Sequence, residues 1–216
     1  MGKVRFGDLR RFTPIDLDFG FERGQPIDRY YIEKFIQAHA GDIKGRVLEF
    51  YDNNYTVKFG KDRVLKSDVM NLDAKRRATI VGDLTKADFI PSESFDCIIC
   101  TQTLFFMYDF RAAIRHLYRI LKSGGVLLVT VPGISQRADH QGEDSWVDYW
   151  RFTKVSARLP FEETFLPEQI TVQSRGNIFA ATSFLYGLAV EEVKPEEFEY
   201  QDPNFEVIIS IRAVKS

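Results

Sequence analysis

The chain has 216 residues, of which 44% are hydrophobic and 28% charged, and its formal net charge at pH 7 is -2. This size predicts one α/β domain spanning residues 1–216, with a normal core. The near-neutral charge gives no electrostatic reason to expect nucleic acid or an anionic membrane as a partner. No stretch reads as a membrane-spanning helix and the start lacks the apolar core of a secretory signal, so we expect a cytoplasmic protein.

Residues 1–27 mix Arg, Asp, Gly and Pro and predict an irregular N-terminal extension. A helix is predicted over 30–40, with Asp28 as its cap and Gly41 after its end. The remaining elements alternate along the chain. Strands are predicted over 46–50, 63–69, 78–82, 95–101, 126–131, 170–174 and 205–214. Helices are predicted over 109–121, 154–165 with an interruption at Pro160, and 178–193.

Strands that alternate with helices imply a mostly parallel sheet with right-handed crossovers. The strands at 95–101 and 126–131 are apolar almost throughout, which suits strands covered on both faces. A last strand that follows the helix at 178–193 fits one antiparallel strand near the edge. We therefore predict an α/β fold with a Rossmann-like sheet and helices on both faces.

The two cysteines, Cys97 and Cys100, lie in one apolar run. Their C-x-x-C spacing also occurs in zinc and redox sites. On a strand, however, residues three apart point to opposite faces, and no further Cys or His pair completes a zinc site. We therefore expect buried structural cysteines, in keeping with a reducing compartment, and no metal site.

Acidic residues accompany the first two strands, at Glu49 and Asp68. We expect Asp68 to close its strand, since acidic residues at the ends of adjacent strands are how a Rossmann-like site grips an adenosine ribose. The turn between them should be rich in glycine, yet residues 51–56 read Tyr-Asp-Asn-Asn-Tyr-Thr. Asn and Asp tolerate positive φ better than most residues, so the sequence predicts that residues 52–54 supply the glycine-like geometry.

Three segments are distinctive in combination: G-D-L at 82–84, S-F-D-C-I-I at 94–99, and R-I-L-K-S-G-G followed by an apolar strand at 119–132. In order and spacing they resemble the class I S-adenosylmethionine-dependent methyltransferases, particularly the type-11 group. A further segment, D-Y-W-R-F-T at 148–153, resembles methyltransferase-like proteins associated with glycosyltransferases and polysaccharide synthesis.

The resemblance implies a cofactor role for five residues. Glu49 would order the cofactor loop, and Asp68 would accept hydrogen bonds from both ribose hydroxyls. Asp83 would accept from the adenine amino group, with Leu84 supplying an apolar or backbone contact, and Gln102 would lie by the methionine end. A plain structural interpretation stays open for each polar residue: an ion pair for Glu49, turn caps for the aspartates and a surface position for Gln102.

Residues 133–153 form a polar loop where the resembled family receives its substrate. Methyl transfer to oxygen needs alignment and a general base. His140 is the best base by its chemistry, with Asp139 or Asp144 to orient it, although a solvated loop histidine is an equal interpretation. Four residues are candidate substrate contacts: Trp146, Tyr149, Trp150 and Arg151. The aromatic ones would form a platform for a sugar face, or would simply pack.

Two functions remain open at this point. The first is an S-adenosylmethionine-dependent enzyme that O-methylates a sugar or polysaccharide precursor, with S-adenosylhomocysteine as its product. The second is a catalytically silent accessory module of a glycosyl-transfer system, suggested by the missing glycine turn and by Leu-Phe-Phe at 104–106 in place of the family's Leu-Glu-His. The expected partners are a small-molecule or saccharide acceptor and a glycosyltransferase.

Overall fold

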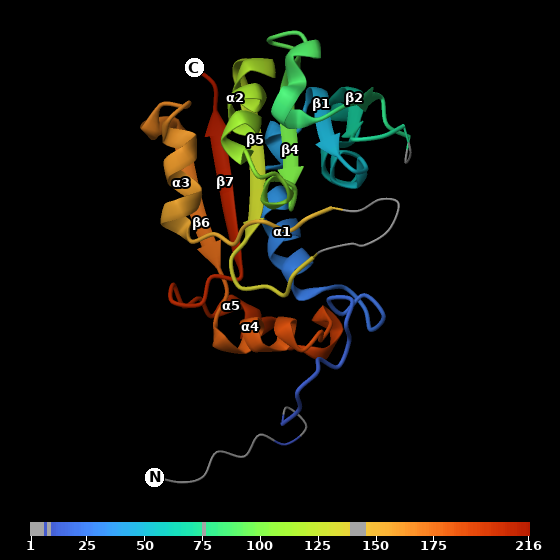
Figure 1. Ribbon diagram of the computed structural model, residues 1–216, viewed down its shortest axis with the longest axis vertical. Coiled ribbons are helices and arrows are strands. Elements are labelled where there is room, and N and C mark those ends of the chain that lie inside the picture. Colours follow the sequence, from blue (N-terminus) through green and yellow to red (C-terminus); the bar gives the residue numbers. More distant parts are fainter. Residues whose placement is uncertain (1–6, 8–9, 75–76, 139–145) are drawn as a thin grey trace.

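The computed structural model describes residues 7, 10–74, 77–138 and 146–216. At its centre is a seven-stranded sheet with the order β3-β2-β1-β4-β5-β7-β6 (Figure 1). The strands are β1 (Gly45–Phe50), β2 (Val64–Asn71), β3 (Ile80–Val81), β4 (Phe95–Thr101), β5 (Leu121–Pro132), β6 (Ile170–Arg175) and β7 (Ile208–Val214). Only β7 runs against its neighbours, β5 and β6. The predicted sheet with one antiparallel strand near the edge is confirmed.

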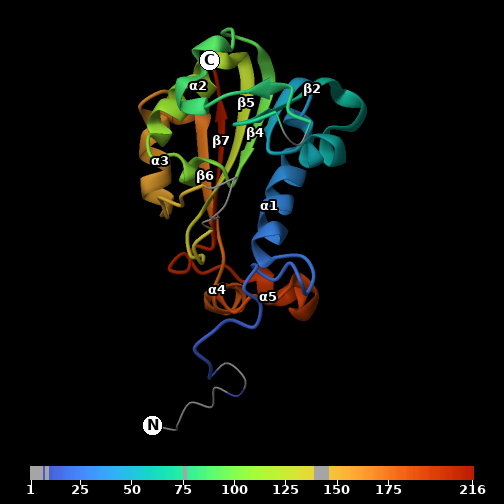
Figure 2. The ribbon, with the colours of Figure 1, turned by 45° about the vertical axis from the view of Figure 1, so that its right-hand side comes forward.

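Helices cover both faces of the sheet (Figure 2). They are α1 (Ile27–Ala38), α2 (Phe110–Ile120), α3 (Lys154–Glu162), α4 (Ile178–Leu185) and α5 (Pro195–Glu199). One core packs α2 and α3 against one face of the sheet, and the other packs α1 against the opposite face and extends to α4 and α5, which lie below the lower edge of the sheet in Figure 1. Alternate strand residues therefore enter different cores, as Leu48 and Val47 do in β1. None of the described helices is long and apolar enough to cross a membrane.

The two cysteines on β4 follow this alternation. Both are fully buried, with Cys97 in the core beneath α1 and Cys100 in the core beneath α2. Burial raises the pKa of both thiols, that of Cys100 to about 12, which keeps them protonated and unreactive at neutral pH. The prediction of buried cysteines on opposite faces is confirmed.

Three predicted helices have different limits in the structure; the one predicted over 154–165 ends at Glu162, and it continues through Pro160 without the predicted interruption. The first begins at Ile27, so Asp28 lies inside its first turn and makes no capping bond, because Pro26 occupies the cap position. The helix predicted over 178–193 ends at Leu185. Gly187 has a φ of +71° and donates its N–H to the carbonyl of Phe184, which is the left-handed glycine conformation that commonly ends a helix.

The described part of the N-terminal extension lies against α4 and is irregular, as predicted. The N–H of Ile15 donates to the carbonyl of Tyr186 at 2.8 Å, and the rings of Phe19 and Phe184 lie 6.0 Å apart. Asp16 is buried and accepts from the N–H groups of Asp18 at 2.6 Å and Glu22 at 3.0 Å. These bonds give a segment without long helices or strands a defined path.

Candidate functional site

The carboxyl ends of the parallel strands lie together at one edge of the sheet, the lower edge in Figure 1. The strand order changes direction between β1 and β4, since β2 follows β1 on one side while β4 lies on the other. Open α/β sheets bind their ligands in the crevice outside such a switch point. The segments that follow β1, β2, β3 and β4 are therefore the candidate cofactor site.

Glu49, the last-but-one residue of β1, holds the turn that follows it. Its carboxylate accepts from the N–H of Tyr55 at 3.2 Å, and from the N–H and Oγ1 of Thr56 at 2.8 and 2.7 Å. The side chain is buried, and burial raises the pKa of Glu49 to about 7 although these hydrogen bonds act in the opposite direction. No Lys or Arg of the described residues forms an ion pair with it. The contacts fit a role in ordering the turn.

The glycine-free turn takes its positive φ at an unexpected residue. Tyr51 has a φ of +73°, whereas Asp52, Asn53 and Asn54 have none of the positive values predicted for them. The chain reverses immediately after β1, where the N–H of Asp52 donates to the carbonyl of Phe50 at 2.9 Å. A bulky residue in this conformation is strained, and such strain is common at functional sites.

The turn is followed by a single π-helical turn over Thr56–Gly60. After β4, Gln102 also has a positive φ, +48°. Its N–H donates to the carbonyl of Thr130 at 2.9 Å and its Nε2 lies 3.4 Å from Thr130 Oγ1. The two strands that border the crevice thus both end in a strained residue.

Asp68 lies inside β2, opposite Leu48, and the expectation that it closes the strand is wrong. The strand runs on to Asn71 because Val69 and Met70, both buried, pair with the last residues of β1.

The carboxylate of Asp68 is already bonded within the protein. It accepts from Arg46 Nε at 2.7 Å and from Thr79 Oγ1 at 3.1 Å, and the side chain is 4% exposed. Lys66 Nζ lies 3.7 Å away. Asp68 therefore joins neighbouring strands on the α2 face of the sheet, and a ligand at the edge would have to displace Arg46 to reach it.

Asn71, which the sequence interpretation missed, occupies the strand end instead. Its Nδ2 donates to the carbonyl of Tyr51 at 3.2 Å, and its Oδ1 has no partner among the described residues. The signal that would have found it is the apolar pair Val69-Met70, which extends the strand beyond Asp68.

Asp83 lies next to this strand end, since the N–H of Gly82 donates to the carbonyl of Asn71 at 2.9 Å. Oδ1 of Asp83 accepts from both the N–H and the Oγ1 of Thr85, at 2.8 and 2.7 Å, and so caps the short helix at Leu84–Phe89. Oδ2 has no partner among the described residues. Leu84 is buried in the core.

These residues fit an adenosine. Two acceptor oxygens without partners in the described chain, Asn71 Oδ1 and Asp83 Oδ2, belong to the adjacent ends of β2 and β3, on the β1 side of the switch point. Acceptors of this kind suit ribose hydroxyls and an adenine amino group. There is less space for the methionine end of the cofactor, because the side chain of Tyr51, which is 48% exposed, stands where a glycine was expected.

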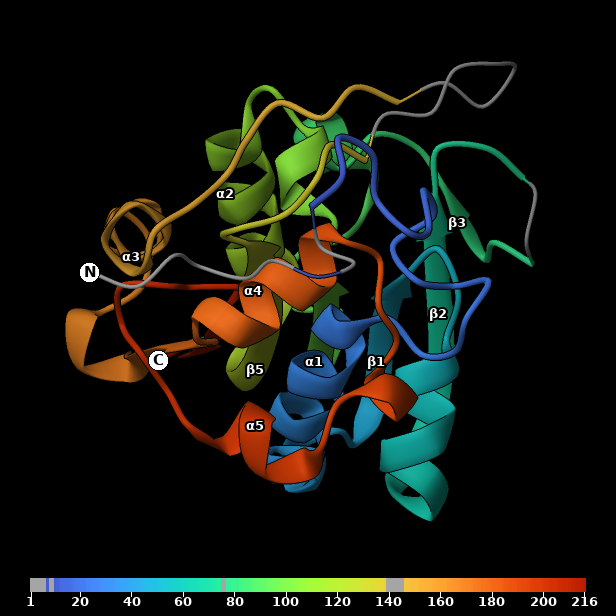
Figure 3. The ribbon, with the colours of Figure 1, turned by 90° about the horizontal axis from the view of Figure 1, so that it is seen from below.

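On the acceptor side, the proposed base His140 and its candidate orienters Asp139 and Asp144 lie outside the described residues. The segment from Trp146 to Thr153 is described and crosses the carboxyl edge of the sheet towards α3 (Figure 3). Its path is fixed by two backbone bonds, from Tyr149 N–H to the carbonyl of Phe105 at 3.0 Å and from Phe152 N–H to the carbonyl of Pro132 at 2.9 Å.

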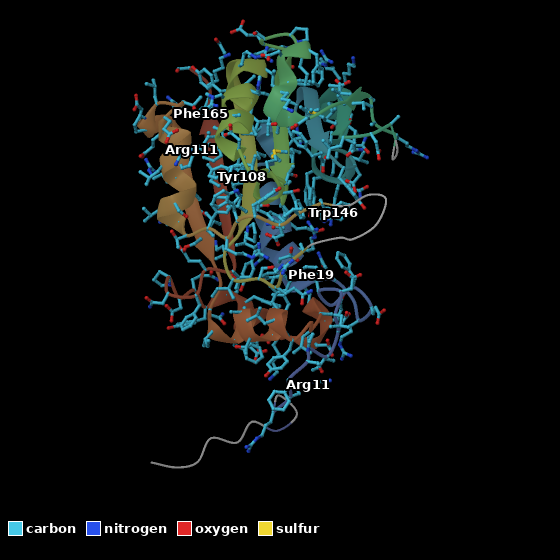
Figure 4. The ribbon with its side chains drawn as sticks, viewed as in Figure 1. Arg11, Phe19, Tyr108, Arg111, Trp146 and Phe165 are labelled. Atoms are coloured by element: carbon cyan, nitrogen blue, oxygen red, sulfur yellow. The ribbon has the colours of Figure 1, made fainter. Side chains whose placement is uncertain are left out.

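The predicted aromatic platform is divided between two places. Tyr149 and Trp150 lie with Tyr108, whose ring is 5.6 Å from Tyr149 and 6.0 Å from Trp150. Tyr108 is 73% exposed, and we call these three residues the aromatic patch. Trp146 lies instead against Phe106, with ring centroids 5.8 Å apart, and Figure 4 places it away from Tyr108. The aromatic run at 105–108 was the available signal for Tyr108, the member that the sequence interpretation missed.

Arg151 stabilises the segment from Trp146 to Thr153 through contacts inside the protein. It forms a bidentate pair with Asp148, with N–O distances of 2.5 and 2.7 Å, and it also donates to the carbonyls of Gln136 and Trp150. Asp148 in turn accepts from the N–H of Ala138 at 2.8 Å. Such bidentate pairs are rigid as well as strong. Arg151 therefore stabilises segment 146–153, and the N–H groups of its guanidinium that form these contacts donate to the protein itself.

The strain at Tyr51 predicts an inverted order of stabilities. At most positions in regular structure a protein with Gly is less stable than the same protein with Ala, by about 0.5–1 kcal/mol. At a left-handed φ the order reverses, and we expect Tyr51→Gly to be more stable than Tyr51→Ala by about 1 kcal/mol. Both variants lack the ring, so denaturant unfolding of the pair isolates the backbone effect. Asn53→Gly and Asn53→Ala, where φ is not positive, should keep the ordinary order; the ordinary order at Tyr51 as well would contradict the strained turn.

The raised pKa of Glu49 predicts a pH-dependent stability. Because the folded-state pKa is about 7 and the ordinary value 4.5, the folded protein binds more protons than the unfolded chain between these values. The free energy of unfolding should therefore fall as pH rises through this window, with a contribution from Glu49 of about 3 kcal/mol. Glu49→Gln should flatten this dependence, while Glu168→Gln, at an exposed site, should keep it. Equal slopes in all three proteins would show that Glu49 titrates normally.

The comparison with known proteins agrees with this geometry. A family model described as a methyltransferase domain, Methyltransf_11, matches residues 17–129, more than half of the 216 residues. None of the curated proteins matches significantly.

Similar solved structures share the fold. An S-adenosylmethionine-dependent methyltransferase from Archaeoglobus fulgidus has a TM-score of 0.59 at 11% identity, covering 93% of this chain and 100% of that one. A phosphoethanolamine N-methyltransferase from Haemonchus contortus, in complex with phosphomonomethylethanolamine and S-adenosylhomocysteine, has a TM-score of 0.55 at 14% identity over 86% of this chain and 52% of that one. The [4+2]-cyclase SpnF has a TM-score of 0.55 at 13% identity over 95% and 88%.

At these identities the structures establish the fold, and the family model carries the assignment. Its match runs from the N-terminal extension into β5 and includes all strands that border the crevice. The chain therefore belongs to the methyltransferase domain family, whose members are enzymes that use S-adenosylmethionine as their cofactor.

Proposed function

We propose that this protein transfers a methyl group from S-adenosylmethionine to a hydroxyl oxygen of a saccharide acceptor. The observation that supports this acceptor is the aromatic patch, in which two exposed rings, Tyr108 and Tyr149, lie beside the half-buried Trp150 on segments that follow the carboxyl ends of β4 and β5. Aromatic faces combine a large apolar surface with a polar tip, and this suits the mixed surface of a sugar ring. The resemblance of segment 148–153 to proteins associated with polysaccharide synthesis points the same way.

For the adenosine half of the cofactor we assign Asn71 to the ribose and Asp83 to the adenine, with the Leu84 backbone beside it. Glu49 orders the turn through its three hydrogen bonds, and Gln102 lies towards the methionine end. Asp68 remains the competing candidate for the ribose. We favour Asn71 because its oxygen is without a partner among the described residues, whereas Asp68 is paired with Arg46.

The bound cofactor supplies an electrophilic sulfonium methyl group. The protein has to hold the acceptor oxygen in line with that methyl group and to receive the hydroxyl proton. We assign to His140 the role of the base that receives this proton, with Asp139 or Asp144 orienting its ring. The aromatic patch and Trp146 would exclude water on either side of the acceptor, while Arg151 keeps the segment in place through Asp148.

A second candidate is a catalytically silent accessory module that works with a glycosyltransferase. The Arg46–Asp68 ion pair and the strained Tyr51 favour it, because both occupy positions where a cofactor contact was expected. The two candidates make opposite predictions for binding of the product cofactor.

Calorimetric titration with S-adenosylhomocysteine distinguishes them. We expect saturable binding that is weakened at least tenfold by Asn71→Ala and by Asp83→Ala. Asp68→Asn should leave the affinity unchanged and lower the stability by about 1 kcal/mol through the lost pair with Arg46. Absence of binding at millimolar ligand would favour the silent module. If folded Asp68→Asn lost binding while Asn71→Ala kept it, the ribose contact would have to be assigned to Asp68.

The base assignment has its own test. His140→Ala should lower the rate of methyl transfer to a saccharide acceptor by about 10²–10⁴-fold, as is typical when a general base is lost. The affinity for S-adenosylhomocysteine should not change, since the residue faces the acceptor in this assignment. His116→Ala, on α2, is the matched control. Unchanged turnover in His140→Ala would remove it as the base.

A further inference from the structure

A second polar site lies at the same edge of the sheet, at the end of strand β6. A cavity of about 300 Å³ opens between the start of α3, the end of β6 and the loop before β7. Strand β6 is antiparallel to β7, as β5 is, so its carboxyl end points to the same edge as those of β1 and β4. The side chains that line the cavity are polar or charged except at Pro203: Lys154, Gln173, Ser174, Arg175, Gln201 and Asp202.

Both cations of this cavity are without an ion-pair partner in the described chain. Among the described residues, Lys154 Nζ has no carboxylate oxygen within ion-pair distance, and the Arg175 guanidinium donates to the neutral Oε1 of Gln173 at 3.3 Å and acts on Glu199 only through its charge, from beyond ion-pair distance. Elsewhere, comparable cations are paired, as Arg46 is with Asp68 and Arg212 with Asp42. Two unpaired cations around one cavity attract an anion.

Two carboxylates at or near the cavity bond to the protein, although Asp202, which lines the cavity, keeps its Oδ2 without a partner among the described residues. Oδ1 of Asp202 accepts from the N–H and the Nδ2 of Asn204, both at 2.9 Å. Oε2 of Glu206 accepts from the backbone N–H of Lys154 at 2.8 Å. By contrast, the other cavity, of about 400 Å³ beside His39, contains the Arg212–Asp42 ion pair, which already balances its cation. The cavity at β6 is therefore the stronger candidate for an anion.

One continuous piece of chain carries Tyr149 and Trp150 of the aromatic patch and Lys154 of the cavity. Lys154 is the fourth residue after Trp150, so their Cα atoms lie at most about 14 Å apart. The segment runs along the carboxyl edge into α3 (Figure 1), and at the start of α3 the N–H of Lys154 donates to Oε2 of Glu206, in the loop that precedes β7. A ligand of moderate length can reach both.

We propose that this cavity binds the phosphate group of a phosphorylated saccharide whose sugar ring lies on the aromatic patch. The proposal rests on the proposed function, because it names the class of its acceptor. Lys and Arg side chains are the usual phosphate ligands, Lys as a point charge and Arg through paired N–H donors. The hydroxyl of Ser174 and the amide of Gln173 add neutral donors at the same cavity.

Calorimetric titration with inorganic phosphate and with a hexose 1-phosphate tests the proposal. We expect both to bind the wild-type protein, the hexose 1-phosphate at least tenfold more tightly. The double variant Lys154→Gln/Arg175→Gln should weaken both ligands at least tenfold. A matched control, Lys44→Gln/Arg115→Gln, removes two exposed cations elsewhere and should change neither. Tyr149→Ala should weaken the hexose 1-phosphate alone.

Three results would overturn the proposal: no phosphate binding, equal loss in the control double variant, or a hexose 1-phosphate that binds no better than phosphate. The affinity for S-adenosylhomocysteine, measured on the same proteins, should not depend on the cavity. Phosphate binding without cofactor binding would therefore contradict the methyltransferase function and leave the anion site standing. Cofactor binding without phosphate binding would contradict the anion site and leave the methyltransferase function standing.

Discussion

The hydrogen bonds between Glu49 and the turn after β1 are the constraint on which the candidate site depends. A buried carboxylate that accepts from two backbone N–H groups and one hydroxyl fixes where the chain leaves the sheet. Without glycine, the reversal has to be made by a residue with a side chain, and Tyr51 makes it at a φ of +73°. Strain at Tyr51 persists only if something else holds the turn, and Glu49 is the group that does so. The cost is a carboxylate kept in a low-dielectric environment, which its raised pKa reflects.

From this turn the other parts of the site follow. The carbonyl of Tyr51 accepts from Asn71, which ties the end of β2 to the turn, and the carbonyl of Asn71 accepts from Gly82, which ties in the start of the Asp83 loop. Three successive strand ends are thus connected by hydrogen bonds at one edge. On the other side of β1, Gln102 and the segment after Trp146 extend this edge towards α3. The site is a row of loops held by hydrogen bonds from backbone and side chains, and the bidentate pair of Arg151 with Asp148 fixes the segment after Trp146.

Much of the fold could be predicted from local sequence, because strong patterns are local. The apolar run at Phe95–Thr101 and the amphipathic helix after Asp109 have the limits that their residues suggested, within a residue. The end of β2 could not be predicted from local sequence, because whether Val69 and Met70 continue the strand depends on the partner strand with which they pair. The ion pair between Arg46 and Asp68 likewise joins residues 22 apart, and the contact of Tyr108 with Tyr149 needs the loops to be placed first. The chemistry of individual residues was readable, whereas their neighbours at the site were not.

The central claim is that the glycine-free turn leaves a working cofactor site whose ribose contact lies at the end of β2. A crystal structure of the protein with S-adenosylhomocysteine tests it most directly. The account predicts the adenosine between Asn71 and Asp83, with Tyr51 still at positive φ and the Arg46–Asp68 pair intact. A ribose bound to Asp68 with Arg46 displaced, or crystals grown at millimolar ligand with nothing bound at this edge, would contradict it.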